Sequence, residues 1–132
     1  SAGLEKRFVS RQIEGLQIKA PDWERPVSSL SGGNQQKVVV GNWLNTEPQL
    51  ILFDEPTRGI DVNAKQQIFQ MMWDLNRRSI ASVFVSSELE ELLEVCQRIL
   101  IMRHGSIVGE VSPERTKIDE LYAMCMGEET VV

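Results

Sequence analysis

Two acidic side chains follow a run of apolar residues in the stretch LILFDEP. Asp54 and Glu55 come directly after residues 50–53, an apolar run typical of a strand that is buried on both faces of a parallel sheet. Such sheets bind ligands beyond the carboxyl ends of their strands. One carboxylate there can hold Mg²⁺ with a nucleotide, and its neighbour can orient or deprotonate an attacking water. The same two acids can also form a solvated turn without a catalytic role.

A second stretch, LSGGNQQK at residues 30–37, places a serine and two glycines before a predicted helix over 34–44. A phosphate can approach the amides of Gly32 and Gly33 closely, because neither residue has a side chain. These amides also lie at the start of the helix, where the helix dipole favours an anion. Ser31 can donate a hydrogen bond to the same anion. The alternative is that Ser31 only caps the helix, which explains the serine but not two successive glycines.

The order and spacing of three segments, LSGGNQQK, LILFDEPTRGID and VFVSSE, resemble the ATP-binding cassette (ABC) ATPases. Residues 30–37 resemble the signature motif of that family, residues 50–55 its Walker B strand, and residues 59–61 its D-loop. Three longer segments are similar to the sequences of one branch of the family, and they are LSGGNQQKVVVGNWL, DEPTRGIDVNAK and VSSELEELLE. That branch is the second cassette of tandem ATPases from bacterial monosaccharide importers.

The resemblance implies that the signature motif acts across an interface between two cassettes. Its nucleotide-binding residues contact ATP seated on the opposite cassette, at the γ-phosphate, and they are Ser31, Gly32, Gly33 and Asn34. Asp61 of the D-loop is expected to touch the opposite cassette across the same interface. In this interpretation the glycines lack side chains because the nucleotide of the partner presses against their backbone.

The resemblance also assigns chemistry to the end of the predicted Walker B strand. Asp54 helps to hold Mg²⁺, and Glu55 is the general base of ATP hydrolysis. The family carries a switch histidine after the next strand, predicted here over 80–85, and this chain has Ser87 at that position. A serine lacks the charge and reach of an imidazole. We therefore expect the site that contains Glu55 to be weak, and the intact signature to serve the ATP of the partner cassette.

Helices and strands that position these residues alternate along the chain. The apolar periodicity predicts helices over 4–16, 34–44, 62–77, 88–96 and 118–126. Strands are predicted over 50–53, 80–85 and 98–102, followed by a fourth, antiparallel strand within 104–111. This alternation predicts an α/β fold with a mainly parallel sheet flanked by helices. With the resemblance, the fold is a partial P-loop NTPase core of the ABC ATPase type.

The sequence contains no G-x-x-x-x-G-K-[ST] loop of the kind that cradles the α- and β-phosphates, the Walker A motif. We therefore expect the C-terminal portion of an ABC nucleotide-binding domain. Residues 1–45 form the end of the helical subdomain with the signature, and residues 46–132 run from Walker B to the C-terminal helix. By itself the chain is expected to hold neither ATP nor Mg²⁺ and to be inactive. The strands that flank the Walker A strand in the family are expected to expose unpaired edges, which predicts self-association.

Composition and charge bound the class of protein. The chain has 132 residues, of which 42% are hydrophobic and 25% charged, as in one globular domain or part of one. The formal net charge is −5 and the basic residues are scattered, which argues against a nucleic-acid partner. Cys96 and Cys125 lie outside any metal or redox spacing and are interpreted as reduced cytoplasmic thiols. No apolar run approaches the roughly 20 residues of a membrane-spanning helix.

These observations predict part of the ATP-hydrolysing subunit of a monosaccharide importer, peripheral on the cytoplasmic face of the bacterial inner membrane. Its partners are expected to be a second ATPase cassette, transmembrane permease subunits and, indirectly, a periplasmic sugar-binding protein. A non-catalytic regulatory cassette is one alternative, and Ser87 favours it. A non-transport ABC ATPase of DNA repair or chromosome maintenance is another. Long heptad helices or zinc-ligand spacings are expected of that class, and the sequence shows neither.

Overall fold

The computed structural model describes residues 2–127, and the chain divides into two compact units. The first unit comprises residues 1–83 and the second residues 84–132. The boundary falls inside a strand, β2 (Ala81–Val85), and not at the predicted subdomain boundary between residues 45 and 46. These units are groups of residues in mutual contact, so the predicted subdomain boundary stays a prediction.

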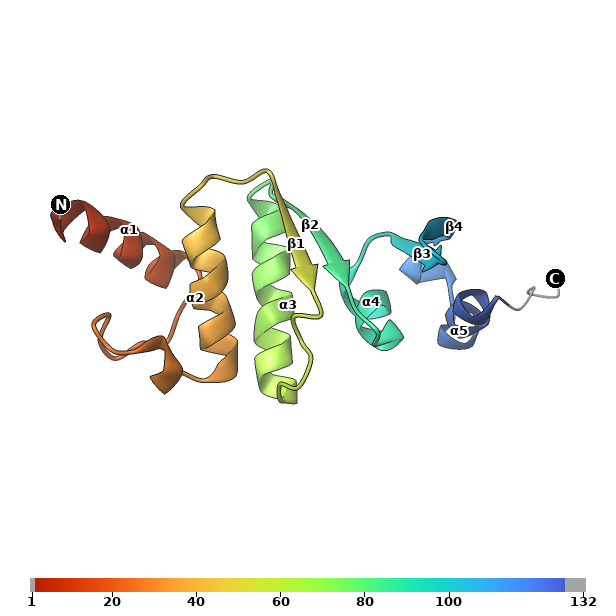
Figure 1. Ribbon diagram of the computed structural model, residues 1–132, viewed down its shortest axis with the longest axis horizontal. Coiled ribbons are helices and arrows are strands. Elements are labelled where there is room, and N and C mark those ends of the chain that lie inside the picture. Colours follow the sequence, from red (N-terminus) through yellow and green to blue (C-terminus); the bar gives the residue numbers. More distant parts are fainter. Residues whose placement is uncertain (1, 128–132) are drawn as a thin grey trace. The chain divides into compact units, whose positions relative to one another are not determined.

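The first unit holds the elements from α1 to the first residues of β2, which Figure 1 shows in red to green. In chain order they are α1 (Ala2–Gly15), the short 3-10 helix η1 (Val27–Ser29), α2 (Gly32–Leu44), β1 (Leu50–Asp54), α3 (Val62–Arg77) and β2. Helices α2 and α3 lie side by side and begin at the same end (Figure 1). The predicted signature and D-loop therefore meet at one end of this helix pair.

The longest helix, α3, has the bounds that the sequence predicts. It begins at Asp61, whose side-chain oxygen accepts a hydrogen bond of 2.9 Å from the backbone N–H of Ala64, as an N-cap residue does. Its inward side chains are the most buried of the first unit, and they are Ile68, Phe69, Met71, Met72 and Leu75. The apolar residues recur at helical spacing, so one face of α3 forms the core of this unit.

Helices α1 and α2 approach each other closely at a glycine. A Cβ atom on Gly41 would lie 3.1 Å from Cβ of Gln12 and 3.2 Å from Cδ1 of Leu16, both of which are buried. Gln12 also donates a side-chain hydrogen bond of 2.9 Å to Asn45, directly after the end of α2. The helix that carries the signature is thus held from both sides, by α1 and by α3.

Strands β1 and β2 form a two-stranded sheet, and their arrows point the same way in Figure 1. The apolar run of β1 predicts burial on both faces, and this prediction is wrong for the described residues. Phe53 is buried, but Leu50 and Leu52 are 57% and 65% exposed, because they alternate onto the opposite face. Val83 on β2 is 46% exposed in the same way. Residues 2–127 therefore cover only one face of this strand pair.

The second unit contains a hairpin and two further helices. Its elements are α4 (Leu89–Val95), β3 (Ile99–Arg103), β4 (Ser106–Val111), the 3-10 helix η2 (Pro113–Arg115) and α5 (Ile118–Met126). Ile99 and Ile101 of β3 pack with Leu121 of α5 in a buried cluster. The helix predicted over 118–126 is confirmed, and it ends at Gly127 in the left-handed conformation.

The predicted mainly parallel sheet is not what the described residues form. They form two separate two-stranded sheets, β1 with β2 and β3 with β4, and the second is antiparallel. Strand β3 pairs with β4, the next strand in the chain, because His104 and Gly105 form a tight turn between them, with φ of 49° and 78°. Positive φ at both central residues is the backbone that a two-residue hairpin requires. The predicted antiparallel direction of the fourth strand is confirmed.

Between residues 2 and 127, no helix is both long enough and apolar enough to cross a membrane.

Candidate functional site

The predicted signature lies at the first turn of α2, and its serine does not cap the helix. Ser31 occupies the N-cap position with φ −62° and ψ 154°, yet its side chain makes no capping hydrogen bond. The serine is exposed, and its Oγ accepts a hydrogen bond of 2.9 Å from Nδ2 of Asn34. The first backbone N–H groups of a helix have no partner within the helix. The start of α2 therefore offers uncapped amides and a serine hydroxyl to an anion.

The start of α3 differs from the start of α2, because a side chain caps it. Asp61, the predicted D-loop residue, accepts the N–H of Ala64 in the first turn of its own helix. A carboxylate at this place also satisfies the positive end of the helix dipole. Of the two adjacent helix starts, only that of α2 is left without a side-chain cap. Asp61 is exposed and its carboxylate has further acceptor capacity, so the cap is compatible with a contact across an interface.

The two signature glycines differ in the space around them. A Cβ atom on Gly33 would lie 3.3 Å from Cα of Ala64 and 3.1 Å from Oε1 of Gln67, both on α3. A Cβ atom on Gly32 would meet only Cγ2 of Ile60, at 3.8 Å, which is ordinary contact. The close crossing of α2 and α3 is thus sufficient to explain the glycine at position 33. Gly32 has no such explanation within the described residues, and it is exposed.

This difference predicts unequal effects of adding a methyl group. Overpacking a close contact typically destabilises a protein by about 1–3 kcal/mol. Replacing glycine by alanine in a helix has the opposite effect and stabilises it by up to about 1 kcal/mol. We expect Gly33→Ala to lower the free energy of unfolding by about 1 kcal/mol, because Ala64 must move. Gly32→Ala should leave it within about 0.5 kcal/mol. Urea unfolding followed by circular dichroism measures both, and equal stability of the two variants would contradict the close-crossing explanation.

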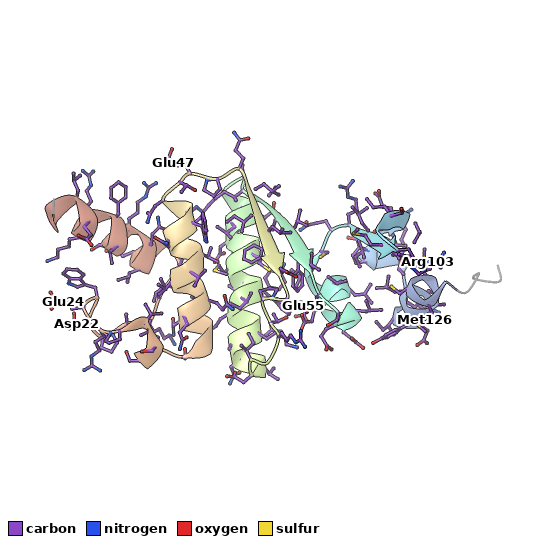
Figure 2. The ribbon with its side chains drawn as sticks, in the orientation of Figure 1. Asp22, Glu24, Glu47, Glu55, Arg103 and Met126 are labelled. Atoms are coloured by element: carbon purple, nitrogen blue, oxygen red, sulfur yellow. The ribbon has the colours of Figure 1, made fainter. Side chains whose placement is uncertain are left out.

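The predicted Walker B acids lie where the sequence predicts, at the carboxyl end of β1. Asp54 is the last residue of the strand and is exposed. Glu55 follows with φ +46°, a left-handed conformation that is uncommon for residues other than glycine. Its carbonyl accepts a hydrogen bond of 3.2 Å from the N–H of Arg58 and so closes a turn. Figure 2 labels Glu55 near the tip of the β1 arrow and Glu47 near the end of α2, in the loop that leads to the start of β1.

Buried Pro56 and Thr57 follow the two acids. They anchor the loop that leads from Glu55 to the start of α3. In the part of the chain that the structure describes, no cluster of three or more His, Cys, Asp or Glu side chains is arranged to hold a metal. Exposed carboxylates such as that of Asp54 are the kind of oxygen ligand that hard cations take.

The predicted switch position lies in the second unit, between β2 and α4. Ser87 is exposed. Its neighbour Ser86 donates a hydrogen bond of 3.2 Å to Glu91 and accepts one of 3.0 Å from the N–H of Glu88. The hydroxyl of Ser86 thus helps to start α4. The only histidine, His104, lies in the hairpin turn, as the sequence predicts.

The structure buries three polar residues whose burial the sequence does not predict, and they are Asn34, Lys37 and Glu91. Asn34 is 6% exposed, although the sequence predicts a nucleotide contact there. Lys37 is 9% exposed, and its amine donates a hydrogen bond of 3.4 Å to the carbonyl of Gln17. Burial lowers the pKa of Lys37, as does nearby Lys19, and Asp74 opposes the shift. Glu91 on α4 is buried as well, with 4% of its surface exposed.

Comparison with known proteins places these features in a family. The sequence profile of the ABC transporter family matches residues 5–58. The chain is 45% identical to the ribose import ATP-binding protein RbsA of Oceanobacillus iheyensis, over 93% of this chain and 25% of that protein. It is 46% identical to the galactose/methyl galactoside import ATP-binding protein MglA of Fusobacterium nucleatum, over 85% of this chain and 22% of that protein.

A third relative belongs to the same group. The arabinose import ATP-binding protein AraG of Shigella boydii is 44% identical, over 95% of this chain and 24% of that protein. The chain therefore spans about a quarter of the length of the curated relatives that it matches.

Solved ABC cassettes share the fold. The structure matches the ADP conformation of an ATP-binding cassette of an ABC transporter with a TM-score of 0.74 and 25% identity. This match covers 96% of the present chain and 47% of the solved one. A nucleotide-free cassette matches with a TM-score of 0.75 at 22% identity, over 95% of this chain and 47% of that one. The α/β prediction is confirmed as a mixed α/β structure that corresponds to part of an ABC cassette.

Proposed function

We propose that this chain, which belongs to the ABC transporter ATPase family, forms part of the ATP-hydrolysing subunit of a monosaccharide importer. One observation carries the proposal. The relatives that match most of the chain at 44–46% identity are named import ATP-binding proteins for ribose, galactose and arabinose. All three substrates are single sugars.

The start of α2 provides the contact to ATP in this proposal. The exposed Ser31 hydroxyl and the uncapped first-turn amides of Gly32 and Gly33 bind the γ-phosphate of ATP that is seated on an opposite cassette. Negative charge grows on the transferred phosphoryl oxygens during hydrolysis, and fixed donors aimed at that charge stabilise the transition state. Asp61 contacts the opposite cassette while it caps α3.

The end of β1 belongs to the second composite site of the cassette pair. Asp54 is a fitting ligand for Mg²⁺, because an exposed carboxylate at a strand end can share the ion with phosphate oxygens. When bound, Mg²⁺ neutralises charge on the phosphates. Glu55 accepts the proton of the attacking water. Ser87 stands where the family carries a histidine, so this second site contributes less to turnover.

Glu55→Gln tests this division between the two sites. Removing a general base costs roughly 10²–10⁴-fold in a site that dominates turnover. We expect a loss of less than about 10-fold in ATP hydrolysis by the full-length protein that contains this chain. Glu47→Gln is the matched control, because Glu47 has a similar φ of 51° but lies before β1, in the loop from α2. A loss of 10²-fold or more with Glu55→Gln would place the dominant site at Glu55.

A regulatory cassette without turnover is the second candidate, and Ser87 favours it. In that case Glu55→Gln leaves ATP hydrolysis equal to the wild-type rate, whereas substitutions in the signature still reduce it. The proposed importer and the regulatory cassette therefore share the signature contact and differ only in the use of Glu55.

The proposal includes an arrangement for the whole protein. Residues 1–45 form the end of a helical subdomain, and residues 46–132 extend from the Walker B strand to the last helix. The partners are a second cassette and the transmembrane permease subunits, with a periplasmic sugar-binding protein acting through the permease. The protein lies at the cytoplasmic face of the inner membrane as a peripheral subunit.

Reconstituted transport tests the proposed function. The full-length protein and its permease are placed in proteoliposomes with ATP inside, and uptake of labelled ribose, galactose and arabinose is measured with the binding protein outside. We expect ATP-dependent uptake of at least one of these sugars, and none with the non-hydrolysable analogue. A disaccharide and a dipeptide serve as controls. ATP-dependent uptake of a control substrate alone would contradict a monosaccharide importer.

A further inference from the structure

A chain of two hydrogen bonds connects the loop before the signature to the signature serine. The backbone N–H of Lys19 donates to Oδ1 of Asn34 at 2.9 Å. Nδ2 of Asn34 in turn donates to Oγ of Ser31 at 2.9 Å. Asn34 is 6% exposed, so its amide is enclosed between these two partners.

The direction of both hydrogen bonds follows from chemistry. A backbone N–H can only donate, so the atom of Asn34 that faces Lys19 must be the carbonyl oxygen. The amide NH₂ therefore faces Ser31, and the serine oxygen must accept. A hydroxyl has one proton to donate. Because its oxygen accepts from Asn34, the proton of Ser31 is directed elsewhere, and no acceptor for it is present among residues 2–127.

We propose that Asn34 is a positioning residue, which presents the hydroxyl of Ser31 as a hydrogen-bond donor to the γ-phosphate. The inference rests on the proposed function, and it departs from the resemblance, which implies a nucleotide contact for Asn34. Asn34 does not itself contact the nucleotide, because its amide is buried and each end already makes a hydrogen bond within the chain. Its role is to fix the direction of the proton of Ser31 before ATP arrives, so that the donor needs no reorientation.

A purely structural role is the rival explanation. Asn34 also ties the segment at Lys19 to α2, and the amine of Lys37 ties the same segment through the carbonyl of Gln17. A variant that keeps the tie but reverses the second hydrogen bond separates the two roles. Asn34→Asp does so, since a carboxylate still accepts from the N–H of Lys19 but can only accept from Ser31. The hydroxyl then turns toward the carboxylate and away from the phosphate.

The experiment is a double-mutant cycle in the full-length protein, with kcat and KM for ATP hydrolysis as readouts. Removal of one donor to a developing oxyanion reduces kcat by about 10²–10³-fold in the strongest cases. We expect Ser31→Ala and Asn34→Asp each to reduce kcat by at least about 10-fold. Because Asn34 acts through Ser31, the double variant should fall within about 3-fold of the more damaged single variant.

Three outcomes would overturn the proposal. If the two single effects multiply in the double variant, Asn34→Asp acts through its charge and not through Ser31. If Asn34→Asp retains the wild-type kcat while Ser31→Ala does not, the orientation of the hydroxyl is unimportant, although the proposed signature contact survives. If Ser31→Ala also retains the wild-type kcat, the proposed contact itself fails and the positioning role fails with it.

Hydrogen exchange supplies a readout that does not depend on activity. In the 132-residue chain the amide of Lys19 should exchange slowly, because Asn34 accepts its proton. We expect similar protection in Asn34→Asp and at least about 10-fold faster exchange in Asn34→Ala. Loss of protection in Asn34→Asp would show that its lower kcat follows from the broken tie, which favours the purely structural role and contradicts the positioning role.

Discussion

Gly32→Asp is expected to reduce ATP hydrolysis by the full-length protein by at least about 10²-fold without loss of stability. The backbone tolerates the substitution, because a Cβ atom at this position meets only Cγ2 of Ile60, at 3.8 Å. A carboxylate in the first turn of a helix stabilises it by about 0.3–1 kcal/mol. The same charge occupies the place that we propose for the γ-phosphate, and two like charges in one site repel each other strongly. Activity and stability should therefore separate.

Two control substitutions isolate the charge. Gly32→Ala adds a methyl group without charge and should cost less than about 10-fold in the rate of hydrolysis. Gly15→Asp adds the same charge at the end of α1, where nothing lies within 4 Å of the new Cβ atom. Steady-state hydrolysis and thermal unfolding are measured for all three variants. A Gly32→Asp enzyme within about 3-fold of Gly15→Asp would contradict a phosphate contact at the start of α2.

Gly33 is a poorer position for this test, although the resemblance assigns it the same contact. An aspartate there would meet Ala64 and Gln67 on α3 at 3.1–3.4 Å before it met any ligand. A loss of activity could then reflect displacement of α2 from α3. In the structure, Gly33 is required by close packing against α3, whereas Gly32 is exposed and can be reached by a ligand. The sequence alone does not distinguish the two glycines.

The bounds of α3 and α5 could be predicted from the sequence because the signals are local. In α3 an N-cap residue precedes apolar residues at helical spacing, and in α5 a glycine follows the last turn. The acids at the end of β1 could be placed for the same reason, since a strand ends where the apolar run meets Asp54. Each of these features depends on residues that are close together in the chain.

The roles of Gly33 and Asn34 could not be predicted, because their partners are distant in sequence. Gly33 meets Ala64 on another helix, and Asn34 meets the backbone of Lys19 in a preceding loop. The prediction of one mainly parallel sheet failed for a similar reason. An apolar strand predicts that something covers each face, but it does not identify the covering element. In residues 2–127 Leu50 and Leu52 remain exposed.

Self-association of the 132-residue chain is the expected consequence of this exposed sheet face. Leu50, Leu52 and Val83 are 46–65% exposed on two neighbouring strands of the first unit. Apolar side chains beside unpaired strand edges are a template for pairing with another chain. We expect light scattering to report a mass that rises above 15.0 kDa as the concentration increases from about 10 μM to 1 mM.

Charge on this face should prevent the association. Leu52→Lys combined with Val83→Lys places two like charges on the exposed face, and charged side chains on edge strands oppose pairing. We expect this double variant to remain a monomer over the same range. Val62→Lys is the matched control, because Val62 is 71% exposed but begins α3 and lies outside the sheet. A wild-type chain that stays monomeric at 1 mM, or a control as monomeric as the double variant, would contradict association through this face.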